Sequence, residues 1–197
     1  VLLAAVLMAA LTGTALAAEV TAPGGIKLTE NGNEWTVTGH TGGNEVTIPA
    51  TYEGKPVTVI APSAFENKGV TRVTIPSGIK TIGTRAFFGT KIQTLEIPGT
   101  VTTIESQAFE QCSSLKSVTF VDPAKSGGST TTTIGSRAFA SCEGLTTLKL
   151  TGSVSGIGQE AFVNCGMSQV IIWPGTNSVG KDAFSMCDKL TKIVIAD

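Results

Sequence analysis

The chain has 197 residues, of which only 15% are charged, and its formal net charge at pH 7 is −1. This balance leaves no basic surface for nucleic acid or for an anionic membrane, so both are excluded as partners. The 23 glycines suit a chain that turns often.

The first 17 residues are expected to be a secretory signal peptide. Residues 1–18 carry no charge and are almost wholly apolar, and polar sequence begins at Glu19. Ala15-Leu16-Ala17 is a small-x-small cleavage signature. A transmembrane helix is the alternative, since about 20 apolar residues span a bilayer. The cleavage signature favours removal, which places the mature chain outside the cell or on its surface and leaves it without membrane contact.

Residues 18–45 are expected to form a linker and an N-terminal β-hairpin cap. The runs Ile26–Thr29 and Trp35–Thr38 flank Asn31-Gly32, and Asn-Gly is the strongest short-range signal for a hairpin. We expect this hairpin to shield the first coil of the segment that follows, with Trp35 lying over its exposed end.

From residue 46 onward, one unit built around an Ala-Phe pair recurs six times. The phenylalanines lie 22, 22, 30, 23 and 22 residues apart. They are Phe65, Phe87, Phe109, Phe139, Phe162 and Phe184. Self-similarity at this period is typical of a solenoid, in which each coil buries its apolar face only against its neighbours.

Each unit opens with a run such as Val70–Ile75, whose last residues alternate between apolar and polar, and this predicts a strand buried on one face. An Ile-Gly step such as Ile82-Gly83 follows, where we expect glycine to turn the chain with a positive φ. The Ala-Phe pair is expected in a short helical or 3₁₀ segment. Coils stacked at the ~4.8 Å strand spacing then line up the phenylalanines in a continuous spine.

The four cysteines all stand three residues after a phenylalanine: Cys112, Cys142, Cys165 and Cys187. In a stack they form one inward-facing column, which favours free, buried thiols. Disulfides between neighbouring coils are the alternative, but parallel side chains keep the Cβ atoms farther apart than the preferred ~3.8 Å. A zinc site is disfavoured because the sequence has no Cys-x-x-Cys pair and no histidine partner.

These columns, Ile-Gly-x-x-Ala-Phe-x-x-Cys with Ile-Pro after the strand, resemble the BspA-like leucine-rich repeats of the Treponema pallidum class. The resemblance covers residues 46–197, and residues 44–57 resemble the family's first, hairpin-like coil. Departures are mild: Glu105 replaces the turn glycine in one unit, and Lys68 and Thr90 replace cysteine in the first two. The resemblance implies an exported arc used for binding, commonly adhesion, and it carries over no catalytic residue and no cofactor.

The predicted fold is therefore a repeat solenoid. It is a leucine-rich-repeat arc with a parallel β-sheet on the concave face, short 3₁₀ or helical turns opposite, and the β-hairpin cap at the N-terminus. The expected organisation is a signal peptide (1–17), a linker and cap (18–45) and a solenoid of about six units (46–197). We expect the solenoid to be truncated at its C-terminus, because no polar cap follows the last strand run.

Candidate binding residues lie on the outward side of the predicted strands, where a solenoid offers a rigid, extended surface. They are Arg72, Thr74, Glu96, Lys149, Ile171, Trp173, Lys192 and Val194. Trp173 beside Ile171 and Val194 resembles an interface hot spot, although further coils that cover this patch are the alternative. An insertion at 122–131 accounts for the 30-residue spacing, either as a neutral excursion or as a ligand-contacting loop.

No catalytic or metal-binding constellation is recognisable in the sequence. The only histidine, His40, has no nucleophile motif near it and is expected to be an exposed loop residue. We therefore predict a non-enzymatic, monomeric binding module, secreted or on the cell surface, for an extracellular protein or glycan, with adhesion as the broad role. The alternative is a passive spacer that presents a downstream enzymatic or wall-anchoring domain.

Overall fold

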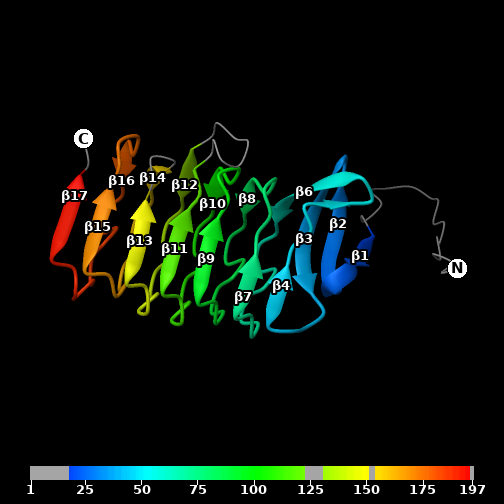
Figure 1. Cartoon of the computed structure of the whole chain (residues 1–197), viewed down its shortest axis with the longest axis horizontal. Helices are drawn as coiled ribbons and strands as arrows, with labels where there is room; N and C mark the ends of the chain where they lie inside the picture. The colour runs from blue at the N-terminus through cyan, green and yellow to red at the C-terminus, as the bar shows by residue number, and fades with distance from the viewer. Residues whose placement is uncertain (1–17, 123–130, 151–153, 196–197) are drawn as a thin grey trace, which may run out of the picture.

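The computed structural model describes residues 18–122, 131–150 and 154–195, with the side chains of Thr147 and Lys149 left out. The predicted signal peptide and nearly all of the 122–131 insertion lie outside the described residues. Figure 1 shows an elongated stack of coils that runs from the blue N-terminal strands to the red strand β17. Within the described ranges, no helix is long and apolar enough to span a bilayer.

The N-terminal cap is an antiparallel unit of three strands: β1 (Glu19–Ala22), β2 (Ile26–Asn31) and β3 (Glu34–His40). A single 3₁₀ turn, η1 (Pro23–Gly25), joins the first two. β2 and β3 form the predicted hairpin, with Leu28 beside Val37, and Gly32 in its turn has a φ of 64°. β3 then pairs in parallel with β6, so the cap is the first layer of the stack.

One sheet runs along the back of the whole stack in the order β1-β2-β3-β6-β8-β10-β12-β14-β16. Its repeat strands are short: β6 (Lys55–Ile60), β8 (Thr81–Ile82), β10 (Thr103–Ile104), β12 (Thr132–Ile134), β14 (Val154–Ile157) and β16 (Ser178–Val179). β5 (Thr51–Tyr52) pairs only with β6. We call this the back sheet. From β6 to β14 each strand ends on a buried isoleucine, and in β16 the same place is taken by the exposed Val179.

A second parallel sheet, formed by the opening strands of all units but the first, lies in front (Figure 1). It contains β9 (Thr94–Ile97), β11 (Ser117–Phe120), β13 (Thr147–Leu150), β15 (Gln169–Ile172) and β17 (Lys192–Ile195). β4 (Glu45–Thr47) and β7 (Arg72–Thr74) form a separate two-stranded sheet. The solvent-facing side of β7, β9, β11, β13, β15 and β17 is called the strand face. The predicted leucine-rich-repeat solenoid is thereby confirmed, with two parallel sheets rather than one.

The Ala-Phe segments are not helical, contrary to the local prediction. The N–H group of Phe65 donates to the Ala86 carbonyl oxygen of the next coil at 2.7 Å, and Phe87 donates to Ala108 in the same way. The residue two before each phenylalanine has a positive φ, for example 56° at Arg85. These left-handed residues direct the N–H groups of the turn along the stack. The backbone hydrogen bonds of the turn therefore form between coils rather than within a helix.

The glycine of the Ile-Gly step is required by close approach, and the expected positive φ is wrong. A Cβ atom on Gly83 would lie 2.6 Å from the backbone nitrogen of Pro62, and one on Gly180 would lie 2.4 Å from that of Gln159. Neither glycine has a positive φ. Coils therefore touch backbone to backbone at this column.

The predicted phenylalanine spine is confirmed. Successive rings, from Phe65 to Phe184, stack nearly parallel with centroids 4.9 to 5.5 Å apart. The first five rings are fully buried, and Phe184 at the end of the stack is partly buried.

The N-terminal end of the spine is covered by His40, not by Trp35. The His40 ring lies 5.3 Å from that of Phe65, and the residue is half-buried at the end of β3 rather than exposed in a loop. Trp35 instead packs edge-on against Tyr52 and donates from Nε1 to the Tyr52 carbonyl oxygen at 2.9 Å. His40 covers the spine because β3 pairs with β6, and this pairing places the end of β3 beside the Ala64-Phe65 turn.

Candidate binding surface

The strand face holds the sequence-predicted binding residues in two outward rows. Backbone register places Glu96 beside Thr119, Thr119 beside Lys149, and Ile171 beside Lys149 on one side and Val194 on the other. The second row is set by the neighbouring residues Thr94, Ser117, Thr147, Gln169 and Lys192. The side chain of Lys149 lies outside what the structure describes.

Several polar side chains on the other two faces bond to neighbouring coils. On the back sheet, hydroxyl groups donate to carbonyl oxygens of the preceding coil: Thr132 to Val101 at 2.7 Å and Thr176 to Val154 at 2.8 Å. Each such bond fastens one coil to the one before it. A bond of this kind contributes about 1 kcal/mol.

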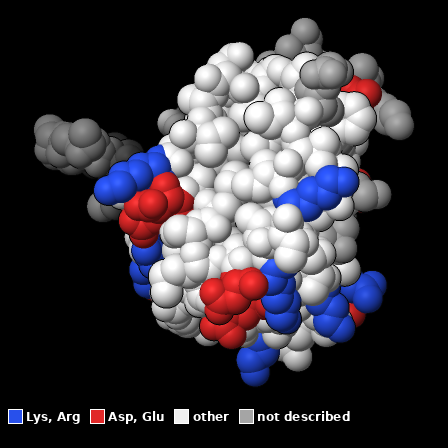
Figure 2. Space-filling view, turned by 90° about the vertical axis from the view of Figure 1, so that its left-hand side faces the viewer, with Lys and Arg blue, Asp and Glu red and all other residues white. Residues whose placement is uncertain are grey.

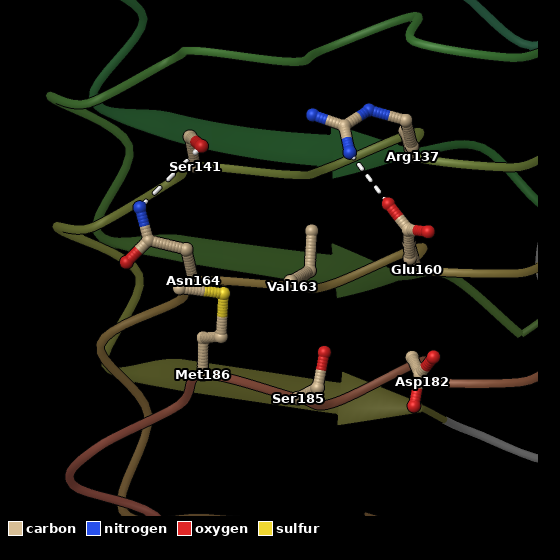
Figure 3. A pocket seen from close by; sticks show the side chains of 8 residues that line it. All are labelled: Arg137, Ser141, Glu160, Val163, Asn164, Asp182, Ser185 and Met186. Atoms are coloured by element: carbon tan, nitrogen blue, oxygen red, sulfur yellow. Dashed lines mark hydrogen bonds and ion pairs between the residues drawn. The ribbon is translucent and has the colours of Figure 1, made fainter.

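On the turn face, where the Ala-Phe segments lie, ion pairs join successive coils. Arg137 donates to Glu110 at 2.7 Å and to Glu160 at 2.5 Å, and Arg85 donates to Glu66 at 2.5 Å. The hydrogen bond from Arg137 lowers the pKa of Glu160, and that from Arg85 lowers the pKa of Glu66. Arg137 and Glu160 border an open hollow of ≈ 420 Å³ (Figure 3). Their charges already compensate each other.

The strand face differs, because four of its polar side chains make no bond to any described residue. Thr74, Thr94, Glu96 and Thr119 make no side-chain hydrogen bond or ion pair among the residues that the structure describes. Arg72 lies 4.0 Å from Glu45, and both side chains are 72% exposed. An exposed pair at that distance contributes little stability. These donors and acceptors remain free for a ligand.

Three of the predicted residues, Arg72, Thr74 and Glu96, border a hollow between β7 and β9. Its volume is ≈ 430 Å³, and Val73, Ile75 and Thr94 complete its lining. The sequence did not indicate this hollow, because the 22-residue spacing across it is the same as in the neighbouring units.

The other predicted residues gather at the far end of the strand face. Ile171 and Val194 are paired and half-buried, and Lys192 pairs with Gln169. Trp173 follows β15 directly and is 48% exposed. β11 separates this group from the hollow, so the structure places the candidates on one face but in two clusters.

The end of the stack beyond β17 is largely uncharged (Figure 2). Val179, Met186, Ile193 and Ile195 are exposed there, although their counterparts in earlier coils include fully buried residues such as Val170 and Leu150. Trp173 is therefore one of five large apolar residues exposed in the described part of the chain, and its role as a hot spot or as a covered residue remains a prediction.

The cysteine column is buried and unbridged, as predicted: Cys112, Cys142, Cys165 and Cys187 are free thiols. Each donates from Sγ to the carbonyl oxygen of a phenylalanine one coil earlier at 3.2 Å. Burial raises the pKa of Cys142 well above its ordinary value, because its thiolate form would lie away from water.

In the parts of the chain that the structure describes, no three His, Cys, Asp or Glu side chains are placed to hold a metal ion. His40 contacts Phe65 and the Gly43 carbonyl oxygen, with its Nδ1 atom buried and without a hydrogen-bond partner.

Residues 43–130 and 124–197 match the family described as BspA type leucine rich repeat region, in six copies. A search of curated proteins found no match.

Three solved bacterial structures share the fold. A leucine rich cell surface protein from Faecalibacterium prausnitzii is 30% identical, with 90% of this chain and 54% of that one covered and a TM-score of 0.60. The T. pallidum leucine-rich-repeat protein is 23% identical over 93% of this chain and 81% of its own, with a TM-score of 0.66. The pneumococcal vaccine antigen PcpA is 17% identical over 93% and 51%, with a TM-score of 0.55. The chain thus spans about half the length of the F. prausnitzii protein.

Proposed function

The chain belongs to the BspA-type leucine-rich-repeat family, and from that premise we propose that its strand face binds an extracellular protein or glycan. The supporting observation is the contrast between the faces. Several polar side chains beside the back sheet and on the turn face are bonded to neighbouring coils, whereas Thr74, Thr94, Glu96 and Thr119 on the strand face make no such bond among the described residues. A rigid sheet whose polar groups are free is suited to recognition, because little ordering of the protein has to accompany binding.

Adhesion from the outside of the cell is the role that we propose for this binding. The F. prausnitzii relative is described as a cell surface protein, and residues 1–17 have the pattern of a signal peptide. Mass spectrometry of material exported by a bacterial host should find an N-terminus at or near Ala18. A membrane-bound protein that retains Val1 would contradict the predicted signal peptide and, with it, the proposed export.

A pair of matched threonine variants tests which face binds. Thr119 in β11 and Thr133 in β12 are both exposed threonines in parallel strands, the first on the strand face and the second on the back sheet. Binding is measured to immobilised fibronectin, collagen and mucin. We expect Thr119→Arg to weaken a bound partner by about tenfold or more, because an arginine displaces shape-matched contacts worth at least ~1.4 kcal/mol.

Thr133→Arg should leave the same binding unchanged. Equal loss in both variants would argue against the strand face. Binding to none of the immobilised partners would favour the passive spacer.

A further inference from the structure

The strand face is interrupted between β7 and β9. β7 pairs with β4 and β9 pairs with β11, but no backbone pairing joins β7 to β9. A hydrogen bond of 3.3 Å from the Gln93 N–H to the Thr71 carbonyl oxygen still links the two coils just before these strands begin. Beyond this hydrogen bond β7 and β9 are not paired, and the ≈ 430 Å³ hollow lies between them. We call it the β7–β9 hollow.

The floor of the β7–β9 hollow is aliphatic and partly accessible. Val73 and Ile75 are 8% and 7% exposed, compared with 3% and 1% for Leu95 and Ile97, which hold the same places in the next coil. No aromatic ring lines the hollow. The surface therefore suits methylene groups better than the flat face of a ring.

Two opposite charges border the hollow, Arg72 on the β7 side and Glu96 on the β9 side. Glu96 has no hydrogen bond or ion pair with any described residue, whereas Arg72 lies near Glu45 on its own side of the gap. A ligand that enters between the strands meets a free carboxylate above an aliphatic floor. A cation on an aliphatic stem is the complementary chemistry.

We propose that the β7–β9 hollow receives a lysine or arginine side chain of a protein partner. Its methylene stem covers Val73 and Ile75, and its cationic head pairs with Glu96, with the hydroxyl groups of Thr74 and Thr94 beside it. This assignment rests on the proposed function of the strand face and specifies a protein as the ligand. A glycan is the less favoured occupant because the hollow has no ring for a sugar to stack on.

The test uses the whole chain and two small probes that differ only in charge. Nα-acetyl-lysine methylamide and Nα-acetyl-norleucine methylamide are titrated while backbone amide NMR shifts are followed. We expect the lysine probe, but not the norleucine probe, to shift the amides of Thr74, Leu95 and Glu96. Glu96→Gln should weaken this binding by about tenfold, because it replaces a charge-assisted hydrogen bond with a weaker neutral one.

Glu143→Gln is the matched control, since it makes the same change at an exposed glutamate outside the hollow, and it should leave the titration unchanged. The proposal is overturned if the norleucine probe binds equally well, if Glu96→Gln has no effect, or if glucose shifts these amides and lysine does not. If the lysine probe does not bind while Thr119→Arg still weakens partner binding, the assignment of the β7–β9 hollow is wrong and the proposed binding by the strand face is retained.

Discussion

The Sγ atom of Cys142 donates a hydrogen bond to the carbonyl oxygen of Phe109, one coil earlier, at 3.2 Å. The same bond recurs at Cys112, Cys165 and Cys187. The thiol column and the phenylalanine spine are therefore one structure, in which each sulfur fastens its coil to the one before. This arrangement needs the cysteines as protonated thiols.

Thiol labelling of the native protein is expected to be slow, even near pH 9. Burial raises the pKa of Cys142 well above its ordinary value and also raises that of Cys187, so a smaller fraction of each is thiolate than of a free cysteine, whose pKa is about 8.5. Denaturation without reductant should then give four equivalents of label, counted by mass spectrometry. Two equivalents or fewer would show that disulfides form.

Removing one ring from the middle of the spine should destabilise the protein strongly. Phe109→Ala is expected to cost about 3 to 5 kcal/mol, because the ring is fully buried between Phe87 and Phe139. Phe184→Ala is the control and should cost less, since that ring is only partly buried. Urea denaturation followed by circular dichroism measures both. Equal losses would mean that the spine does not carry the stability of the central coils.

Arg137→Met should destabilise by about 2 kcal/mol, because it leaves the buried Glu110 carboxylate without its cation. Arg72→Met removes only the exposed pair with Glu45 and should change stability by less than about 1 kcal/mol. Denaturation curves at neutral pH separate the two variants.

The Arg137 variant also has an expected pH dependence. The hydrogen bond from Arg137 lowers the pKa of Glu160 in the folded state. Its stabilising contribution is therefore present above the ordinary glutamate pKa of about 4.3 and is lost as the pH falls below it. The wild-type protein should lose stability more steeply on acidification than Arg137→Met does. Parallel acid profiles would contradict this role of the pair.

Trp173→Ala is expected to weaken a strand-face ligand by about 2 kcal/mol or more while leaving the melting temperature unchanged, because the ring is 48% exposed. Trp35→Ala should do the opposite: that ring is buried and hydrogen-bonded to Tyr52, so the melting temperature should fall. Affinity and melting temperature are measured on the same samples. A loss of stability with unaltered affinity in Trp173→Ala would remove this residue from the binding surface.

The repeat period, the buried columns and the opening strand of each unit were readable from the sequence alone. The Ala-Phe pairs, 22 or 23 residues apart except for one spacing of 30, and alternating runs such as Thr94–Ile97 indicate which side chains point inward, because burial follows periodicity. Residues at equivalent positions of successive units stack on one another. This stacking predicted both the aligned rings and the unbridged cysteines. The outward rows of the strand face followed from the same alternation.

Only the tertiary structure decided how neighbouring coils meet. The flat turns around Phe87, the close approach at Gly83, the contact of His40 with Phe65 and the opening between β7 and β9 all depend on backbone distances between coils. Those distances are set by hydrogen bonds between residues about 22 positions apart. A sequence pattern indicates that such residues are equivalent. The packing of one coil on the next determines whether their backbones are in contact, form hydrogen bonds or are separated.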